Sequence, residues 1–262
     1  MGFFNSYTKE GKGVDKDETK PIRPLYFFEL FFRKFSKMIT LNMLYILLTC
    51  PIWIALGIIM LTLNSASLEE FGVFQQLQMF SYVFMLFSVL TGPATAGITY
   101  MFKSYATEMP TFTMADFFEH YKKNFKQSTL LMIINGLYLL SFSLTLQLPQ
   151  LRMMVIPSII FLVLLIFINF YAFSIMTMFK MKFIDILKNS LIFALAKLPF
   201  NVLYLAIIGG LSYALLIYPV IGAILLFLIF YSFSGFLVVF SVYPTIEKYM
   251  LDPVHGEEEE AE

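Results

Sequence analysis

The chain has 262 residues, of which 59% are hydrophobic and 14% are charged. Soluble domains are about half apolar and about a quarter charged, so this composition excludes an ordinary soluble domain. The 18 Lys and Arg residues balance the 18 Asp and Glu residues, which argues against a nucleic-acid-binding surface.

The two ends of the chain are polar. Residues 1–24 hold no short apolar stretch with a cleavage site, so we expect a polar cytoplasmic tail and no removable signal peptide. Residues 251–262 end in a run of glutamates, which predicts a solvated, disordered acidic tail. Between them we expect one transmembrane domain, residues 25–250.

Six stretches are apolar and long enough to cross a membrane, which takes about 20 residues. None contains Asp, Glu, Lys, Arg or His, and they cover about residues 39–63, 73–101, 129–148, 153–179, 198–218 and 220–243. Only Tyr218 and Pro219 separate the last two, which we interpret as a tight hairpin because one span of that combined length would be far too long. The predicted fold is all-α, a polytopic membrane helix bundle with six transmembrane helices in three hairpins.

Proline and glycine mark special positions inside the spans. Pro51, Pro93 and Pro157 predict kinks. The small residues around Gly92 and Pro93 (92–97) predict close helix packing, with a hinge or a lined cavity as the alternative. Gly209 and Gly210 predict another close crossing in the fifth span.

A short amphipathic helix is predicted before each odd-numbered span, at residues 25–37, 112–126 and 183–197. Each has an acidic residue three or four positions before a basic residue or His, the favourable order in a helix. We expect three interfacial helices on the cytoplasmic side. The expected apolar faces of the second and third consist of Phe118, Tyr121 and Phe125, and of Ile184, Leu187 and Leu191. The candidate cytoplasmic interface consists of Arg33, Lys34, Asp116, Lys122, Lys123, Asp185 and Lys188.

The basic residues lie almost entirely on one side of the predicted spans. Only Arg152 falls in a loop on the opposite side. Since cytoplasmic loops carry an excess of Lys and Arg, this pattern predicts a multi-pass protein with both termini in the cytoplasm.

The string Asn-x-Leu-Tyr occurs in the first helix of every predicted hairpin. Three hairpins of the same orientation suggest parallel repeats, and we take a pseudo-threefold bundle as a hypothesis. The alternative is that the biased composition of the chain mimics a repeat. The amides, with Asn169 as a further one in the fourth span, either join helices by hydrogen bonds or line a site for a neutral solute. The candidate structural or solute-lining residues are Asn42, Tyr45, Gly92, Pro93, Asn135, Tyr138, Asn201 and Tyr204.

Residues for catalysis or metal binding are scarce. Cys50 is the single cysteine, and His120 and His255, the two histidines, lack metal-ligand spacing and are interpreted as solvated or interfacial. No glycine-rich phosphate loop or nucleotide-binding fingerprint occurs. We therefore expect no enzymatic activity, no cofactor and no metal.

Several short motifs resemble the YesL-like family of bacterial membrane proteins, whose function is unassigned. They are Gly11-Lys12-Gly13-Val14, Phe32-Arg33-Lys34-Phe35, Leu41-Asn42, Pro51, Gly92-Pro93-Ala94, and Asp116-Phe117-Phe118 followed by Lys122-Lys123-Asn124-Phe125. Lys12 departs from the proline expected there. The resemblance implies a Gram-positive plasma membrane and an association with carbohydrate uptake, with sugar ABC transporter subunits as candidate partners, since relatives tend to be encoded beside such transporters. It implies no catalytic or ligand-binding residue.

Two hypotheses on function follow. The first is a non-enzymatic accessory or regulatory component of carbohydrate (ABC-type) uptake, which acts through its basic cytoplasmic face. The alternative is a small neutral-solute transporter with an Asn-lined interior, and a scaffold for lipid organisation is a third possibility. The sequence does not indicate a substrate or an oligomeric state.

Overall fold

The computed structural model describes residues 23–65 and 73–251, and these residues form helices without any β-strand. The predicted all-α, polytopic helix bundle is confirmed. Most of the two predicted tails, residues 1–22 and 252–262, lies outside the described residues.

The first unit begins with α1 (Arg23–Arg33) and α2 (Phe35–Ser65) and returns through α3 (Val73–Leu86) and α4 (Ser88–Ala106). The second contains α5 (Thr113–Lys123), α6 (Phe125–Gln147), the 3₁₀ turn η1 (Pro149–Met154) and α7 (Val155–Met178). The third contains α8 (Phe183–Ala196), α9 (Leu198–Ile217), α10 (Pro219–Leu225), the π-helical segment η2 (Leu226–Phe230), α11 (Tyr231–Ile246) and a second π-helical segment, η3 (Glu247–Leu251). Each unit thus begins with the short helix that the sequence predicts.

Five of the described helical segments are long and apolar enough to cross a membrane. They are Phe35–Ala55, Phe125–Gln147, Pro149–Met178, Leu198–Ile217 and Pro219–Leu251. A sixth span results if α3 and α4 are counted together, and these two helices are bent by 71° at their junction. The apolar segments therefore indicate insertion into a lipid bilayer.

The break in the second span is not at its proline. Helix α4 restarts after Phe87, whose φ of −93° and ψ of 7° interrupt the helix, whereas Pro93 lies buried inside α4. Pro157 lies in the first turn of α7, where its missing N–H removes no intrahelical hydrogen bond, so its position requires no kink. Pro51 lies inside α2, which continues past it to Ser65.

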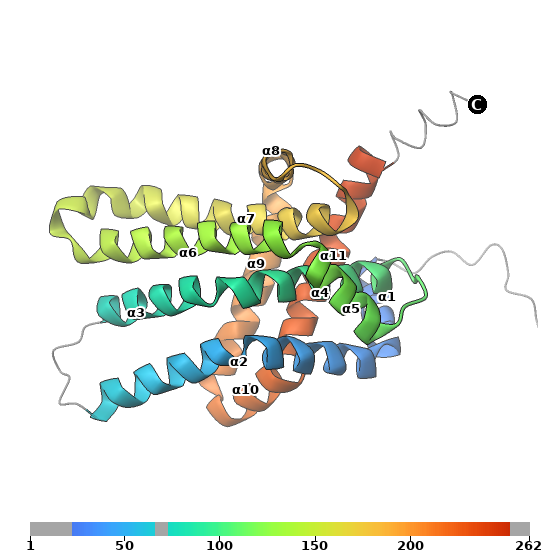
Figure 1. Cartoon of the computed structure of the whole chain (residues 1–262). Coiled ribbons are helices and arrows are strands. Elements are labelled where there is room, and N and C mark those ends of the chain that lie inside the picture. Colours follow the sequence, from blue (N-terminus) through green and yellow to red (C-terminus); the bar gives the residue numbers. More distant parts are fainter. Residues whose placement is uncertain (1–22, 66–72, 252–262) are drawn as a thin grey trace, which may run out of the picture.

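The three hairpins do not repeat one another in space. In Figure 1, the axes of α2, α3, α6 and α7 are roughly aligned, with the chain alternating in direction, whereas α9 and α11 run steeply across them. Helix α11 contacts α2, α4 and α7. The hypothesis of a pseudo-threefold bundle is therefore wrong, because the third hairpin packs diagonally across the other two.

Two buried clusters make up the core, and α4 and α11 contribute to both. The first includes Phe27 of α1 and Phe102 of α4, which both contact the ring of Phe236 on α11. The second includes Tyr171 of α7 and Phe193 of α8, whose ring centroids are 5.7 Å apart. Helices α4 and α11 are thus the central elements.

Helices α5 and α8 pack against the protein through residues other than the expected apolar faces. Helix α5 buries Phe117 and His120, while Phe118 and Phe125 are exposed. Helix α8 buries Ile186, Ser190, Phe193 and Ala194, while Ile184 and Leu191 are exposed. The exposed apolar side chains are compatible with the predicted interfacial position, where such a face lies against lipid, while the opposite face packs inside the protein.

Candidate functional site

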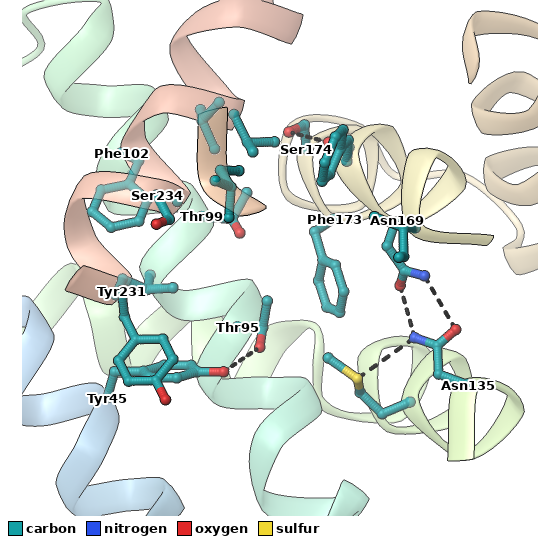
Figure 2. A pocket seen from close by; sticks show the side chains of 18 of the residues that line it. Tyr45, Thr95, Thr99, Phe102, Asn135, Asn169, Phe173, Ser174, Tyr231 and Ser234 are labelled. Atoms are coloured by element: carbon teal, nitrogen blue, oxygen red, sulfur yellow. Dashed lines mark hydrogen bonds between the residues drawn. The ribbon is translucent and has the colours of Figure 1, made fainter. Parts of the chain in front are cut away.

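A cavity of about 560 Å³ lies at the centre of the bundle. Its walls come from α2, α4, α6, α7 and α11, with Phe84 contributed by α3 and Ile208 by α9 (Figure 2). The lining is mostly aliphatic and aromatic and includes no charged side chain. Residues from all three units therefore meet around one apolar space.

An amide pair forms the main polar feature of this cavity. The Nδ2 of Asn135 on α6 donates to the Oδ1 of Asn169 on α7 at 2.8 Å, and the Nδ2 of Asn169 donates back at 3.1 Å. Asn169 also donates to the carbonyl of Leu165 at 2.7 Å. Figure 2 shows the two side chains facing each other across the boundary between α6 and α7.

Two tyrosines line the opposite part of the cavity. The hydroxyls of Tyr45 on α2 and Thr95 on α4 are 3.3 Å apart, and the rings of Tyr45 and Tyr231 have centroids 5.3 Å apart. Figure 2 shows these side chains together on one wall. Ser234, also in the lining, has a buried Oγ with no hydrogen-bond partner in the described part of the chain.

Asn42 and Asn201, the other two repeated amides, do not line the cavity. Asn42 is fully buried, donates to the carbonyls of Leu226 (3.1 Å) and Phe227 (2.6 Å), and accepts from the N–H of Ser232 (3.0 Å). These bonds fasten α2 to the junction of η2 and α11.

Asn201 is also fully buried and accepts a hydrogen bond from the Tyr171 hydroxyl at 3.0 Å. It donates to the carbonyl of Ala194 at 3.0 Å, which joins α9 to α8. The repeated amides thus divide between the two predicted roles, because Asn42 and Asn201 join helices while Asn135 lines the cavity.

The repeated tyrosines divide in the same way. Tyr45 lines the cavity, whereas the Tyr138 hydroxyl donates to the carbonyl of Ser158 at 2.5 Å and joins α6 to α7. Tyr204 is half-buried on α9 and is not in the lining. The lining also includes Asn169, which the sequence analysis named only as a further amide, and Tyr231 and Ser234, which it did not single out. Asn169 could have been identified as a lining residue because it is an amide in an otherwise apolar span. No sequence signal indicated that Tyr231 and Ser234 line the cavity.

The segment around Gly92 and Pro93 packs tightly against its neighbours. A Cβ on Gly92 would lie 2.5 Å from the carbonyl oxygen of Ser128, so α4 crosses α6 at backbone contact. The expectation of close packing here agrees with this geometry. Gly209 and Gly210 differ, since no described atom lies within 4 Å of a Cβ added at either. The expected crossing there is wrong because α9 exposes this face.

A second polar arrangement lies where α1 meets the connection between α4 and α5. Glu108 accepts hydrogen bonds from the Tyr26 hydroxyl (2.5 Å) and from Arg33 (2.6 Å), and it has a φ of 55°, in the left-handed region. These hydrogen bonds hold the pKa of Glu108 below its usual value, and the bond to Glu108 raises the pKa of Tyr26 to about 12. Glu108 thus holds α1 in place beside the α4–α5 connection.

Exposed basic and aromatic side chains surround this arrangement. Phe32 of α1 is 66% exposed and Phe112, at the start of α5, is 81% exposed. We call the exposed surface of α1 and α5 the α1/α5 surface, and in Figure 1 both helices lie at the same end of the molecule. Of its predicted interface residues, Arg33, Lys122 and Lys123 are exposed and Lys34 is half-buried. Asp116 instead accepts the backbone N–H of Phe112 at 2.9 Å and so closes the first turn of α5.

The remaining predicted interface residues, Asp185 and Lys188, lie on α8, where Lys188 is exposed and Asp185 is half-buried. The backbone carbonyl of Asp185 accepts a hydrogen bond from the Asn189 amide at 2.9 Å. In Figure 1, α8 lies apart from α1 and α5, across the far side of α7. The structure therefore does not unite all the predicted interface residues in one patch.

His120 is buried, contrary to the expectation of a solvated or interfacial side chain. Its exposed fraction is 6%, its ring stacks on Tyr100 with centroids 3.3 Å apart, and its Nδ1 has no hydrogen-bond partner in the described part of the chain. Burial lowers the pKa of His120 from its ordinary value of 6.5. The prediction failed because α5 turns this face toward α4. His255 lies outside the described residues.

Part of the chain matches a known protein family. Residues 38–145 match the sequence model of a family described as "Protein of unknown function, DUF624". YesL-like proteins are members of this family, so the resemblance found in the sequence is confirmed over this segment. No curated protein and no solved structure matches the chain. Within residues 23–65 and 73–251, no group of three or more His, Cys, Asp or Glu side chains could hold a metal ion.

Proposed function

We propose that this protein, whose residues 38–145 match the sequence model of the DUF624 family, is a non-enzymatic accessory or regulatory component of a carbohydrate (ABC-type) uptake system in the plasma membrane. The proposal takes the biological setting from the resemblance to YesL-like proteins. The α1/α5 surface is the proposed place of contact with the transporter.

The observation that carries the proposal is the exposure of large aromatic rings beside basic side chains on that surface. Phe32 and Phe112 are more exposed than the other phenylalanines of α1 and α5. Aromatic residues and arginine are enriched at protein–protein contacts, and a basic rim steers an acidic partner. The connection between Glu108 and Arg33 holds α1 in a fixed position, so the surface is ready for contact without reordering.

Co-purification from native membranes tests the proposal. The tagged protein should retain sugar ABC transporter subunits in a mild detergent, and the double variant Phe32→Ser with Phe112→Ser should lose them. Arg152→Ser, an exposed change on the η1 turn, is the control and should retain them. Recovery of the wild-type protein without any transporter subunit would contradict the proposal.

A second candidate, a carrier of small neutral solutes, keeps one supporting observation, namely the amide pair in the central cavity. Its predicted Asn-lined interior is reduced to Asn135 and Asn169, because Asn42 and Asn201 use their amides to join helices. Uptake of a neutral solute into proteoliposomes should then depend on Asn135 and Asn169. Equal uptake by the wild type and by the variant with both changed to Leu would contradict this candidate.

A further inference from the structure

We propose that the central cavity is a binding site for a neutral, long-chain molecule with a single hydroxyl head, the chemistry of a fatty alcohol or of a lipid with a free hydroxyl. This inference goes beyond the accessory function and does not depend on it. It rests on the cavity's size, the chemistry of its lining and the geometry of its amide pair.

The size of the cavity fits a ligand. Protein interiors are close-packed and hold few voids larger than a water molecule. Ligand pockets commonly measure about 300–1,000 Å³, and the central cavity measures about 560 Å³.

The lining selects a neutral and mainly apolar molecule. The walls include Phe84, Leu139, Leu162 and Ile166, and no Asp, Glu, Lys, Arg or His. A sugar or an ion would leave most of its polar groups unpaired against such walls, which costs free energy. A hydrocarbon chain loses no hydrogen bonds there.

The amide pair supplies a place for one hydroxyl. Both N–H groups of the Asn169 amide are used, by the Asn135 oxygen and by the Leu165 carbonyl. The Asn135 amide donates to the Asn169 oxygen and to the Met132 sulfur at 3.6 Å. Each side-chain carbonyl oxygen of the pair accepts one hydrogen bond from the other amide and retains a second lone pair. The pair therefore presents acceptors to the cavity, so the matching ligand group is a donor such as O–H.

The side of the cavity on α7 offers a route from the bilayer. Leu162, Ile166 and Phe170 follow one another at helical spacing, line the cavity and are half-exposed. Ile208 is the single lining residue that α9 contributes. A long-chain molecule dissolved in the bilayer can therefore enter between helices without crossing the polar headgroups.

The test is photo-crosslinking of the purified full-length protein in lipid nanodiscs with a long-chain alcohol that carries a diazirine on its chain. Peptide mapping should place the label mainly on lining residues of α6 and α7. Val238→Phe, which fills the cavity, should lower labelling there about tenfold. The matched control Val202→Phe makes the same change on an exposed position of α9 outside the lining and should leave labelling unchanged.

Changing Asn135 and Asn169 together to Leu tests the head group. This variant should still bind the chain but lose its preference for the alcohol probe over the corresponding alkane probe. If Val238→Phe does not fold, this preference and the map of the wild-type label still decide the proposal. Label spread evenly over the lipid-facing helices, or no preference for the alcohol in the wild type, would overturn it.

Native mass spectrometry of the protein released from its own membranes distinguishes the two sources of such a ligand. A retained lipid that Val238→Phe removes identifies a membrane lipid as the occupant. An unoccupied protein that takes up the added alcohol identifies a free apolar solute. A protein that neither retains a lipid nor takes up the alcohol would contradict the proposal, whether or not transporter subunits co-purify.

Discussion

Asn42 forms hydrogen bonds with backbone groups at the junction of the π-helical segment η2 and α11. The wider turn of a π-helix displaces carbonyl and N–H groups from the regular i→i−4 pattern. The Asn42 side chain bonds to the carbonyls of Leu226 and Phe227 and to the N–H of Ser232, and it is fully buried. One side chain thereby fixes the position of α2 against the third hairpin.

We predict that Asn42→Leu lowers the free energy of unfolding by about 1–3 kcal/mol, because it leaves buried backbone groups unpaired. Thermal unfolding in detergent measures the effect. Thr40→Val is the control, since Thr40 is exposed and bonds within its own helix to the carbonyl of Ser36. Equal stability of Asn42→Leu and the wild type would show that η2 does not need these bonds.

His120 gives the protein a pH-dependent stability. Burial lowers its pKa, with Lys123 and Lys103 acting in the same direction and Glu119 and Asp116 opposing them. The unfolded chain therefore binds a proton at a higher pH than the folded chain does. The stability contributed by neutral His120 is fully present above its ordinary pKa of 6.5 and is lost as the pH falls below that value.

We predict that the melting temperature falls between pH 7.5 and pH 5.5, a window of about one unit on either side of the ordinary histidine pKa. His120→Phe should reduce this fall, because phenylalanine retains the stacking on Tyr100 and carries no titrating group. Melting curves of both proteins at the two pH values measure the difference. The same fall in both would assign the pH dependence to other groups.

At the scale of elements, the backbone contact between α4 and α6 depends on the absence of a side chain at Gly92. Small residues allow membrane helices to approach closely, where packing rather than the hydrophobic effect holds them together. Ala94 and Ala96 beside it are fully buried. The same reasoning does not apply to α9, where the Gly209 position is open.

We predict opposite outcomes for the same substitution at these two positions. Gly92→Ala should lower the free energy of unfolding by about 1–3 kcal/mol, because its Cβ would overlap the Ser128 carbonyl and push α4 from α6. Gly209→Ala should be neutral or stabilising by up to about 1 kcal/mol, because alanine favours the helix. Unfolding of both variants in one detergent provides the comparison, and a stable Gly92→Ala would place α4 farther from α6.

At the scale of the whole molecule, the predicted orientation assigns α1, α5 and α8 to the cytoplasm and the η1 turn to the exterior. Arg152 lies in that turn and is exposed, as are Lys123 on α5 and Lys188 on α8. Single-cysteine variants can test this assignment, because Cys50 is the one native cysteine.

In a Cys50→Ser background, we expect a membrane-impermeant maleimide to label Arg152→Cys in intact cells and to leave Lys123→Cys and Lys188→Cys unlabelled. All three should react after the cells are lysed. Labelling of Lys123→Cys in intact cells would reverse the orientation. Labelling of Arg152→Cys and Lys188→Cys together would instead place α8 on the other side of the membrane from α5.

The apolar spans and the short helices before them could be predicted from the sequence. A long run of apolar residues must be covered by protein or by lipid wherever it lies, so the run itself is sufficient to indicate a span. The bend after Phe87, the diagonal third hairpin and the inward face of α5 depend on which surfaces meet, and a residue's neighbours in sequence do not encode that. The candidate site divides in the same way. Asn135 was predictable as a polar group in an apolar span, but only the tertiary structure separates its role from those of Asn42 and Asn201. An amide lines a cavity or joins helices according to the partner that packing brings within hydrogen-bond distance.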